Sequence, residues 1–260
     1  MTQHIGHTVS PGLPGPVHPA PAWRVWSSAW TAQVPPLADR DDLTVVVTPG
    51  AGHGSPACFT PSNATIEVDA THVAADPAVV DPHDPAQRTL YAAGWGLLVH
   101  EAAHARHSKA NLASPTPSAS RAAELLDEAR VEAQQLHRRP ADQPWLHAAT
   151  TKLILNDLDG HDTPWTAGTA AALLLARADA GVLTHAEVAQ VRKQIVKVLG
   201  RRRLKKLEVI WRRALRTRDD DAAAMLEWGR RWCRTLNMPL TQAPPILIIG
   251  GNGGGAIRGT

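Results

Sequence analysis

The residues of this chain best suited to chemistry are His100, Glu101 and His104, which form the pattern H-E-x-x-H. On an α-helix, residues four positions apart lie on the same face, so both imidazoles can bind a single zinc ion. Glu101 lies next to them around the helix, close enough to accept the proton of a zinc-bound water. The spacing therefore predicts a zinc-dependent hydrolytic site.

The motif lies in a segment with the features of a packed helix, expected from Pro85 to about His107. Asp84 is a favourable N-cap residue, and proline fits the first turn of a helix, where a backbone N–H has no helical partner. An apolar stripe at helical spacing predicts that this helix packs on the core. The stripe consists of Leu90, Ala93, Leu97, Leu98, Ala102 and Ala105.

A catalytic zinc needs a third protein ligand, and the next predicted helix supplies acidic candidates. Glu128 and Glu132 border the apolar face of that helix, which must look toward the helix that carries the histidines. This favours Glu128 as the ligand, with Glu132 as a carboxylate that hydrogen-bonds to a metal ligand without binding the metal itself. The alternative is Glu124, which follows His104 by 20 residues, a spacing similar to that of thermolysin-like enzymes. Asp127 is a further alternative, expected with Glu124 on the opposite side of the helix.

Two segments together resemble a known class of domain: Val99–His104 and Leu126–Glu132, the latter reading LDEARVE. They are similar to the zincin-like metallopeptidase domains of actinobacterial proteins associated with MoxR-type ATPases and von Willebrand factor A modules. The resemblance covers about residues 38–138. It implies a gluzincin-like zinc metalloprotease with Zn²⁺ as cofactor, a peptide or protein substrate, and a MoxR-type ATPase or von Willebrand factor A protein as a partner.

The segment Cys58–Asp69 is similar to the strand that precedes the active-site helix in many zincins. In those proteins this strand forms the sheet edge along which a peptide substrate lies. The resemblance therefore implies that Thr65–Asp69 provides the substrate edge.

Strands precede helices along the chain, which predicts an α+β fold with a small N-terminal sheet and a mostly helical C-terminal half. We expect strands at Leu43–Thr48, Cys58–Phe59 and Thr65–Asp69. The later helices are expected at about 85–107, 118–138, 143–158, 164–180, 184–199, 201–216 and 219–236. The expected units are a disordered lead over 1–22, a zincin-like core over 23–138, a helical subdomain packed on it over 139–238, and a flexible Gly/Pro-rich tail over 239–260.

The composition of the chain indicates a globular protein that does not span a membrane. The chain has 260 residues, 43% of them hydrophobic, which is enough for a substantial core. It contains no apolar run long enough to cross a membrane and no signal-peptide pattern, so we expect a cytoplasmic protein without a membrane partner. Cys58 and Cys233 form no C-x-x-C pair, and we expect two buried thiols.

The segment from Val191 to Arg218 contains twelve Lys and Arg residues and a single acid, Glu208. Such runs are usually the solvated faces of helices, so nucleic acid is not the expected partner. An alternative function uses this surface: a metallopeptidase-like binding or assembly module that docks an ATPase or another partner through the basic helices 191–218.

Overall fold

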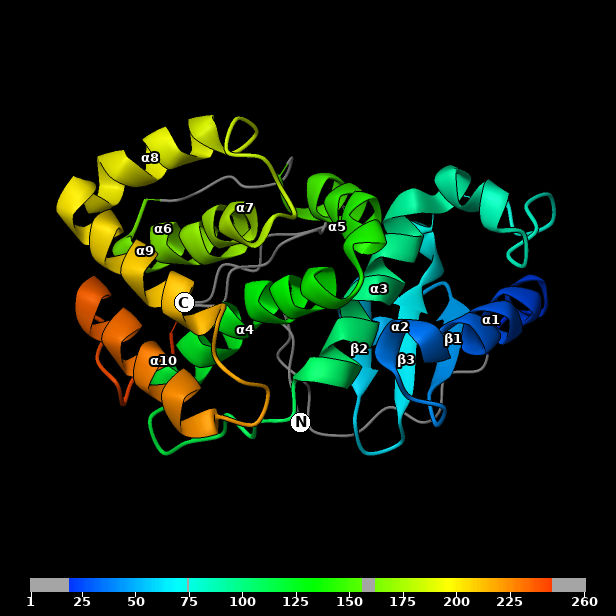
Figure 1. Cartoon of the computed structure of the whole chain (residues 1–260), viewed down its shortest axis with the longest axis horizontal. Coiled ribbons are helices and arrows are strands. Elements are labelled where there is room, and N and C mark those ends of the chain that lie inside the picture. Colours follow the sequence, from blue (N-terminus) through cyan, green and yellow to red (C-terminus); the bar gives the residue numbers. More distant parts are fainter. Residues whose placement is uncertain (1–18, 74, 156–161, 245–260) are drawn as a thin grey trace, which may run out of the picture.

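The computed structural model describes residues 19–73, 75–155 and 162–244. A three-stranded sheet lies at one end of the molecule and a group of helices at the other, with one continuous hydrophobic core between them (Figure 1). The predicted α+β fold, with a small N-terminal sheet and a mostly helical C-terminal half, is confirmed.

The sheet has the strand order β1-β3-β2, with bounds β1 (Thr44–Thr48), β2 (Ala57–Thr60) and β3 (Thr65–Asp69). β1 pairs in parallel with β3, and β2 pairs antiparallel with it. The expectation that Thr65–Asp69 forms the substrate edge is therefore wrong, because β3 is the central strand. The edge strand next to α3 is β2. The tight turn after β2 folds the chain back, so that β3 lies between the two other strands.

The helices begin with α1 (Pro21–Gln33) and α2 (Pro35–Ala38) beside the sheet, followed by α3 (Ala92–His107) and α4 (Pro117–Arg138) in the centre. The rest are α5 (Gln143–Thr150), α6 (Pro164–Ala170), α7 (Ala176–Ala180), α8 (Ala189–Leu199), α9 (Arg201–Ala214) and α10 (Ala222–Leu236). Turns of π-helix at Thr151–Leu155 and Ala171–Leu175 continue α5 and join α6 to α7. None of the helices in the described ranges is both long and apolar enough to cross a membrane.

The predicted helix from Pro85 starts differently. Asp84 does cap the segment, by accepting a hydrogen bond from the backbone N–H of Ala86, but Pro85–Tyr91 is a 3₁₀-helix and the α-helix starts at Ala92. The tighter 3₁₀ winding changes which side chains face inward. Leu90 is consequently 57% exposed and does not belong to the apolar stripe.

Three predicted boundaries also move. The lead over 1–22 is too long, because Pro21 already begins α1. The tail over 239–260 begins too early, because the N–H of Ser118 donates to the Leu240 carbonyl and its hydroxyl to that of Gln242. Residues 184–188 form a turn before α8, since Glu187 accepts hydrogen bonds from the N–H and hydroxyl of Thr184. Residues 1–18 and 245–260 lie outside the described chain.

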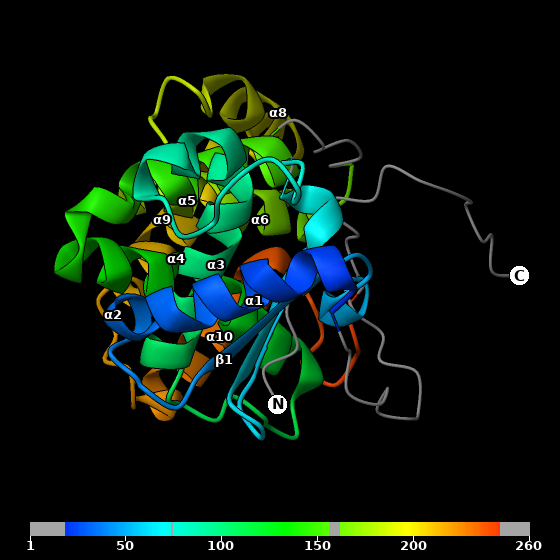
Figure 2. The same cartoon turned by 90° about the vertical axis from the view of Figure 1, so that its right-hand side faces the viewer.

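Aromatic packing joins α1 to α3, the helix that carries the motif. Trp26, Trp30, Tyr91 and Trp95 are fully buried, and their neighbouring ring centroids lie 4.9–6.0 Å apart. Helix α1 crosses beside β1 (Figure 2). There the Ser27 hydroxyl bonds to the backbone N–H and carbonyl of Val47, so α1 covers the outer edge of β1.

Glycine allows α3 to approach α5 closely, and this contact offers a test of the packing. A Cβ at Gly96 would overlap the carbonyl oxygen of Trp145. Although alanine is favoured over glycine in a helix by about 1 kcal/mol, we expect Gly96→Ala to lower the free energy of unfolding in urea by about 1–3 kcal/mol. The control Ala223→Ser, at an exposed position of α10, should change it by less than about 0.5 kcal/mol. Equal stabilities of the two variants would contradict this packing.

Candidate metal centre

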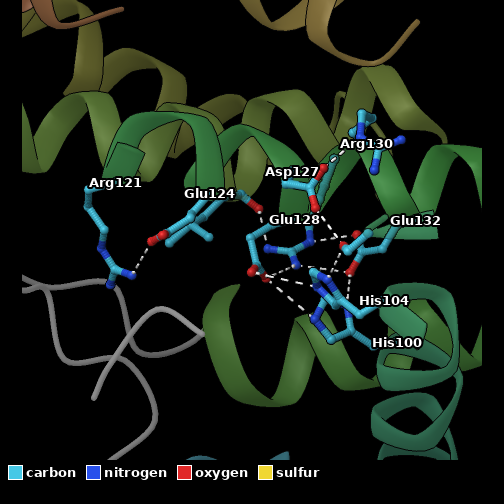
Figure 3. Close-up of polar contacts among 11 residues, drawn as sticks. His100, His104, Arg121, Glu124, Asp127, Glu128, Arg130 and Glu132 are labelled. Atoms are coloured by element: carbon cyan, nitrogen blue, oxygen red, sulfur yellow. Dashed lines mark hydrogen bonds and ion pairs between the residues drawn. The ribbon is translucent and has the colours of Figure 1, made fainter. Parts of the chain in front are cut away.

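The structure brings His100 and His104 of α3 together with Glu128 of α4 (Figure 3). Nε2 of His100 lies 3.4 Å from one carboxylate oxygen of Glu128, and Nε2 of His104 lies 3.7 Å from the other. Two ligands at about 2.1 Å from one tetrahedral ion are separated by about 3.4 Å. The three side chains therefore have the spacing of metal ligands, and the donor set of two imidazoles and a carboxylate suits zinc.

The hydrogen bonds of Nδ1 in each histidine decide which ring nitrogen is available to the candidate metal centre. Nδ1 of His100 lies 2.8 Å from Glu132, whose carboxylate can only accept. Nδ1 of His104 lies 2.9 Å from the hydroxyl of Ser108, whose proton is already donated to Asp127 at 2.6 Å. Both Nδ1 atoms must therefore carry a hydrogen, so Nε2, which faces Glu128, is the nitrogen of each ring that a metal ion can bind.

A buried arginine from α7 fixes the His100 side of the centre. Arg177 donates to both oxygens of Glu132, at 2.6 and 2.9 Å, and its Nη2 lies 3.5 Å from Glu128. Burial alone opposes the ionised form of Glu132, but Arg177 and His100 keep its pKa below the usual value. Glu132 thus remains a carboxylate and accepts a hydrogen bond from Nδ1 of His100.

Burial also opposes the charged form of His100, but Glu128 and Glu132 outweigh this effect and raise the pKa of His100 to about 9. The carboxylates of Glu128 and Glu132 thus stabilise a positive charge at the centre. A divalent cation supplies that charge when it replaces the proton of the imidazole.

The His104 side is held by a longer chain of polar contacts. Asp127, which accepts from Ser108, also pairs with Nε of Arg130 at 2.6 Å. Arg130 is only 1% exposed. Its Nη1 pairs with Asp219 at 2.8 Å, and its Nη2 donates a hydrogen bond of 2.7 Å to the carbonyl of His107. Asp219, in the loop before α10, is therefore connected to the ring of His104 through Arg130, Asp127 and Ser108.

The two alternative ligands take other places. Glu124 points away from the histidines and lies 3.4 Å from Nη1 of Arg121 (Figure 3). The expectation that Asp127 lies on the exposed side is wrong, because it is buried between Ser108 and Arg130. Of the acids considered for this helix, Glu128 is the one that the structure places with both histidines.

A pocket lies next to the candidate metal centre. Glu101 is buried and lines this pocket together with His100, Glu128 and Arg177. The remaining lining is mostly apolar and comes from α3, α4, α5, the π-helical turns and the chain around the start of β2: Ser55, Pro56, Ala57, Leu97, Glu132, Leu146, Ala149, Thr150, Leu153, Ile154 and Leu173. The predicted general base and two of the candidate ligands, His100 and Glu128, therefore line one cavity together with the start of the edge strand.

Two contributors were not predicted from the sequence. Ser108 stands four residues after His104, a spacing that places a hydroxyl one turn away and is a usable signal. Arg177 lies 45 residues after Glu132 on a separate helix, and nothing in the local pattern connects them.

No protein-family model matches the chain, and comparisons with curated proteins and with solved structures find no similar protein. The likeness to zincin-like domains, and to partners such as MoxR-type ATPases, therefore stays a prediction.

Loss of the Ser108 hydroxyl tests the support of His104. In Ser108→Ala the imidazole loses the group that fixes its tautomer, so we expect zinc affinity, measured by competition with a chelating dye, to fall about 10–100-fold. The matched control is Ser120→Ala on α4, because the Ser120 hydroxyl has no hydrogen-bond partner within the described residues. Unchanged affinity in Ser108→Ala would show that this contact does not position a ligand.

Proposed function

We propose that this chain is a zinc-dependent metallopeptidase. The observation that carries the proposal is the convergence of Nε2 of His100, Nε2 of His104 and the Glu128 carboxylate next to a pocket that His100, Glu128 and Glu101 line. Nδ1 of His100 is hydrogen-bonded to Glu132, and Nδ1 of His104 is hydrogen-bonded to Ser108. Such hydrogen bonds are typical of metal-binding histidines.

The donor set supports a catalytic rather than a purely structural site. Three protein ligands leave a fourth tetrahedral position for water or substrate. Zinc bound by these ligands would lower the pKa of a water molecule and polarise a peptide carbonyl. A fully closed structural site would instead use a fourth side chain, commonly a thiolate, and both cysteines lie outside this cluster.

Glu101 is assigned the proton transfers of hydrolysis. The oxygen of the attacking water bonds to the carbonyl carbon, while the Glu101 carboxylate accepts the proton that the water gives up. When the C–N bond breaks, Glu101 delivers that proton to the nitrogen of the leaving amine. One residue thus serves as base and then as acid, and its burial in the pocket lining next to His100 supports this assignment.

The surroundings of the pocket favour a peptide as substrate. Ser55, Pro56 and Ala57 line it at the start of β2, the edge strand on this side of the sheet. An extended peptide can add to such an edge through backbone hydrogen bonds. The apolar side chains of Leu146, Leu153 and Leu173 then offer a place for an apolar substrate side chain.

Replacement of the base separates catalysis from metal binding. In Glu101→Gln we expect zinc to remain bound and the rate of hydrolysis of an unfolded protein substrate to fall about 10²–10⁴-fold. The matched control is Glu124→Gln, because Glu124 pairs with Arg121 away from the histidines and its loss should leave the rate unchanged. The measurements are zinc per chain by atomic spectroscopy and cleavage of a fluorescent casein.

Two results would contradict the proposal. One is protein that takes up no zinc after purification with added Zn²⁺. The other is cleavage by Glu101→Gln at the rate of the unchanged chain, since the proton acceptor would then be another group.

The alternative function, a metallopeptidase-like module that docks an ATPase or another partner, is supported by the surface of α8 and α9. Lys193, Lys197, Arg201, Arg202 and Arg213 are exposed there, and they form no ion pair with any of the described residues. A chain that binds zinc at His100 and His104 but cleaves no peptide, whether or not Glu101 is replaced, would favour this alternative.

A further inference from the structure

A second group of metal-binding residue types lies on the sheet, separate from the histidines of α3. It consists of His53 in the glycine-rich loop after β1, Cys58 in β2 and Glu67 in β3. Cys58 and Glu67 are paired residues of the antiparallel ladder, so their side chains lie side by side on one face of the sheet. The nitrogen, sulfur and oxygen donors all lie within 4.8 Å of one another.

The buried carboxylate of Glu67 is oriented for a cation. One of its oxygens accepts a hydrogen bond of 3.0 Å from the N–H of Gly52, and the other lies 3.4 Å from Nε2 of His53. That second distance is longer than an ordinary N–H···O hydrogen bond of about 2.7–3.2 Å. It equals the separation of about 3.4 Å between two ligands of one tetrahedral zinc ion.

The loop holds the imidazole in this place through an uncommon backbone conformation. His53 has φ +54°, and its neighbours Gly52 and Gly54 have φ +81° and +87°. A left-handed conformation is unfavourable for a residue with a side chain, because its Cβ approaches the following carbonyl oxygen. Glycines on both sides let the chain turn tightly enough to bring His53 back over β3.

We propose that His53, Cys58 and Glu67 form a second zinc site, distinct from the proposed catalytic centre. The three donors are the nitrogen, sulfur and oxygen ligands that zinc accepts, and the partly exposed His53 leaves room for a water as the fourth ligand. On binding, the thiol gives its proton to the solvent and a zinc–sulfur bond forms, with no change in oxidation state.

The position of this site indicates what the ion does. The His53 loop runs directly into Ser55 and Pro56, which line the pocket, and an ion would fasten that loop to β2 and β3. The ion would therefore stabilise the part of the pocket wall that Ser55 and Pro56 form.

Cobalt provides a direct test, because Co²⁺ replaces Zn²⁺ and only a thiolate ligand gives a sulfur-to-cobalt charge-transfer band in the near ultraviolet. The full chain, freed of metal by a chelator, is titrated with Co²⁺. We expect two equivalents to bind and the charge-transfer band to appear. Cys58→Ser should lose the band and one equivalent, whereas the control Cys233→Ser should keep both, since Cys233 is buried in the helical core.

Two further variants complete the test. The double variant His100→Ala/His104→Ala should keep the band and lose the other equivalent, so a failure of the proposed catalytic centre remains distinguishable from a failure of this site. Glu67→Gln retains the volume of the buried side chain and should keep the band but require at least about tenfold more cobalt. Absence of the band in the unchanged chain, or its persistence in Cys58→Ser, would overturn the proposal.

Discussion

The charged residues buried on α4 constrain the rest of this structure. Asp127, Glu128, Arg130 and Glu132 all lie under the protein surface, within two turns of one helix. A buried charge without a partner destabilises a protein by about 3–5 kcal/mol. Each of these residues therefore requires a partner, and the partners come from α3, α7 and the loop before α10. Satisfying these charges fixes how the helices are placed around α4.

The same requirement produces the candidate metal centre. Glu132 is held by Arg177 and orients His100, while Asp127 is held by Arg130 and, through Ser108, orients His104. The ion pairs that connect the helices are thus also the groups that fix the imidazole tautomers. The preorganisation of the centre and the packing of the helical half have a common cause. Glu128, between these two pairs, faces both histidines.

The sheet makes a separate contribution through its edges. Helix α1 covers the outer edge of β1, whereas the opposite strand, β2, starts beside the pocket. The resemblance to zincins led us to expect the edge at Thr65–Asp69, but strand order is set by turns and pairing rather than by distance along the chain. Local alternation predicts that a segment is a strand, and it carries no information about its neighbours.

By itself, the sequence determined the local features: the α+β order of elements, the helix with His100 and His104 on one face, and the inward side of the next helix at Glu128. Helix and strand periodicities set these features, because both depend on residues a few positions apart. Only the tertiary structure decided that Glu128 rather than Glu124 meets the histidines, that Arg177 arrives from α7, and that β3 is central. These outcomes depend on the desolvation of buried charges and on strand pairing, which join residues far apart in the chain.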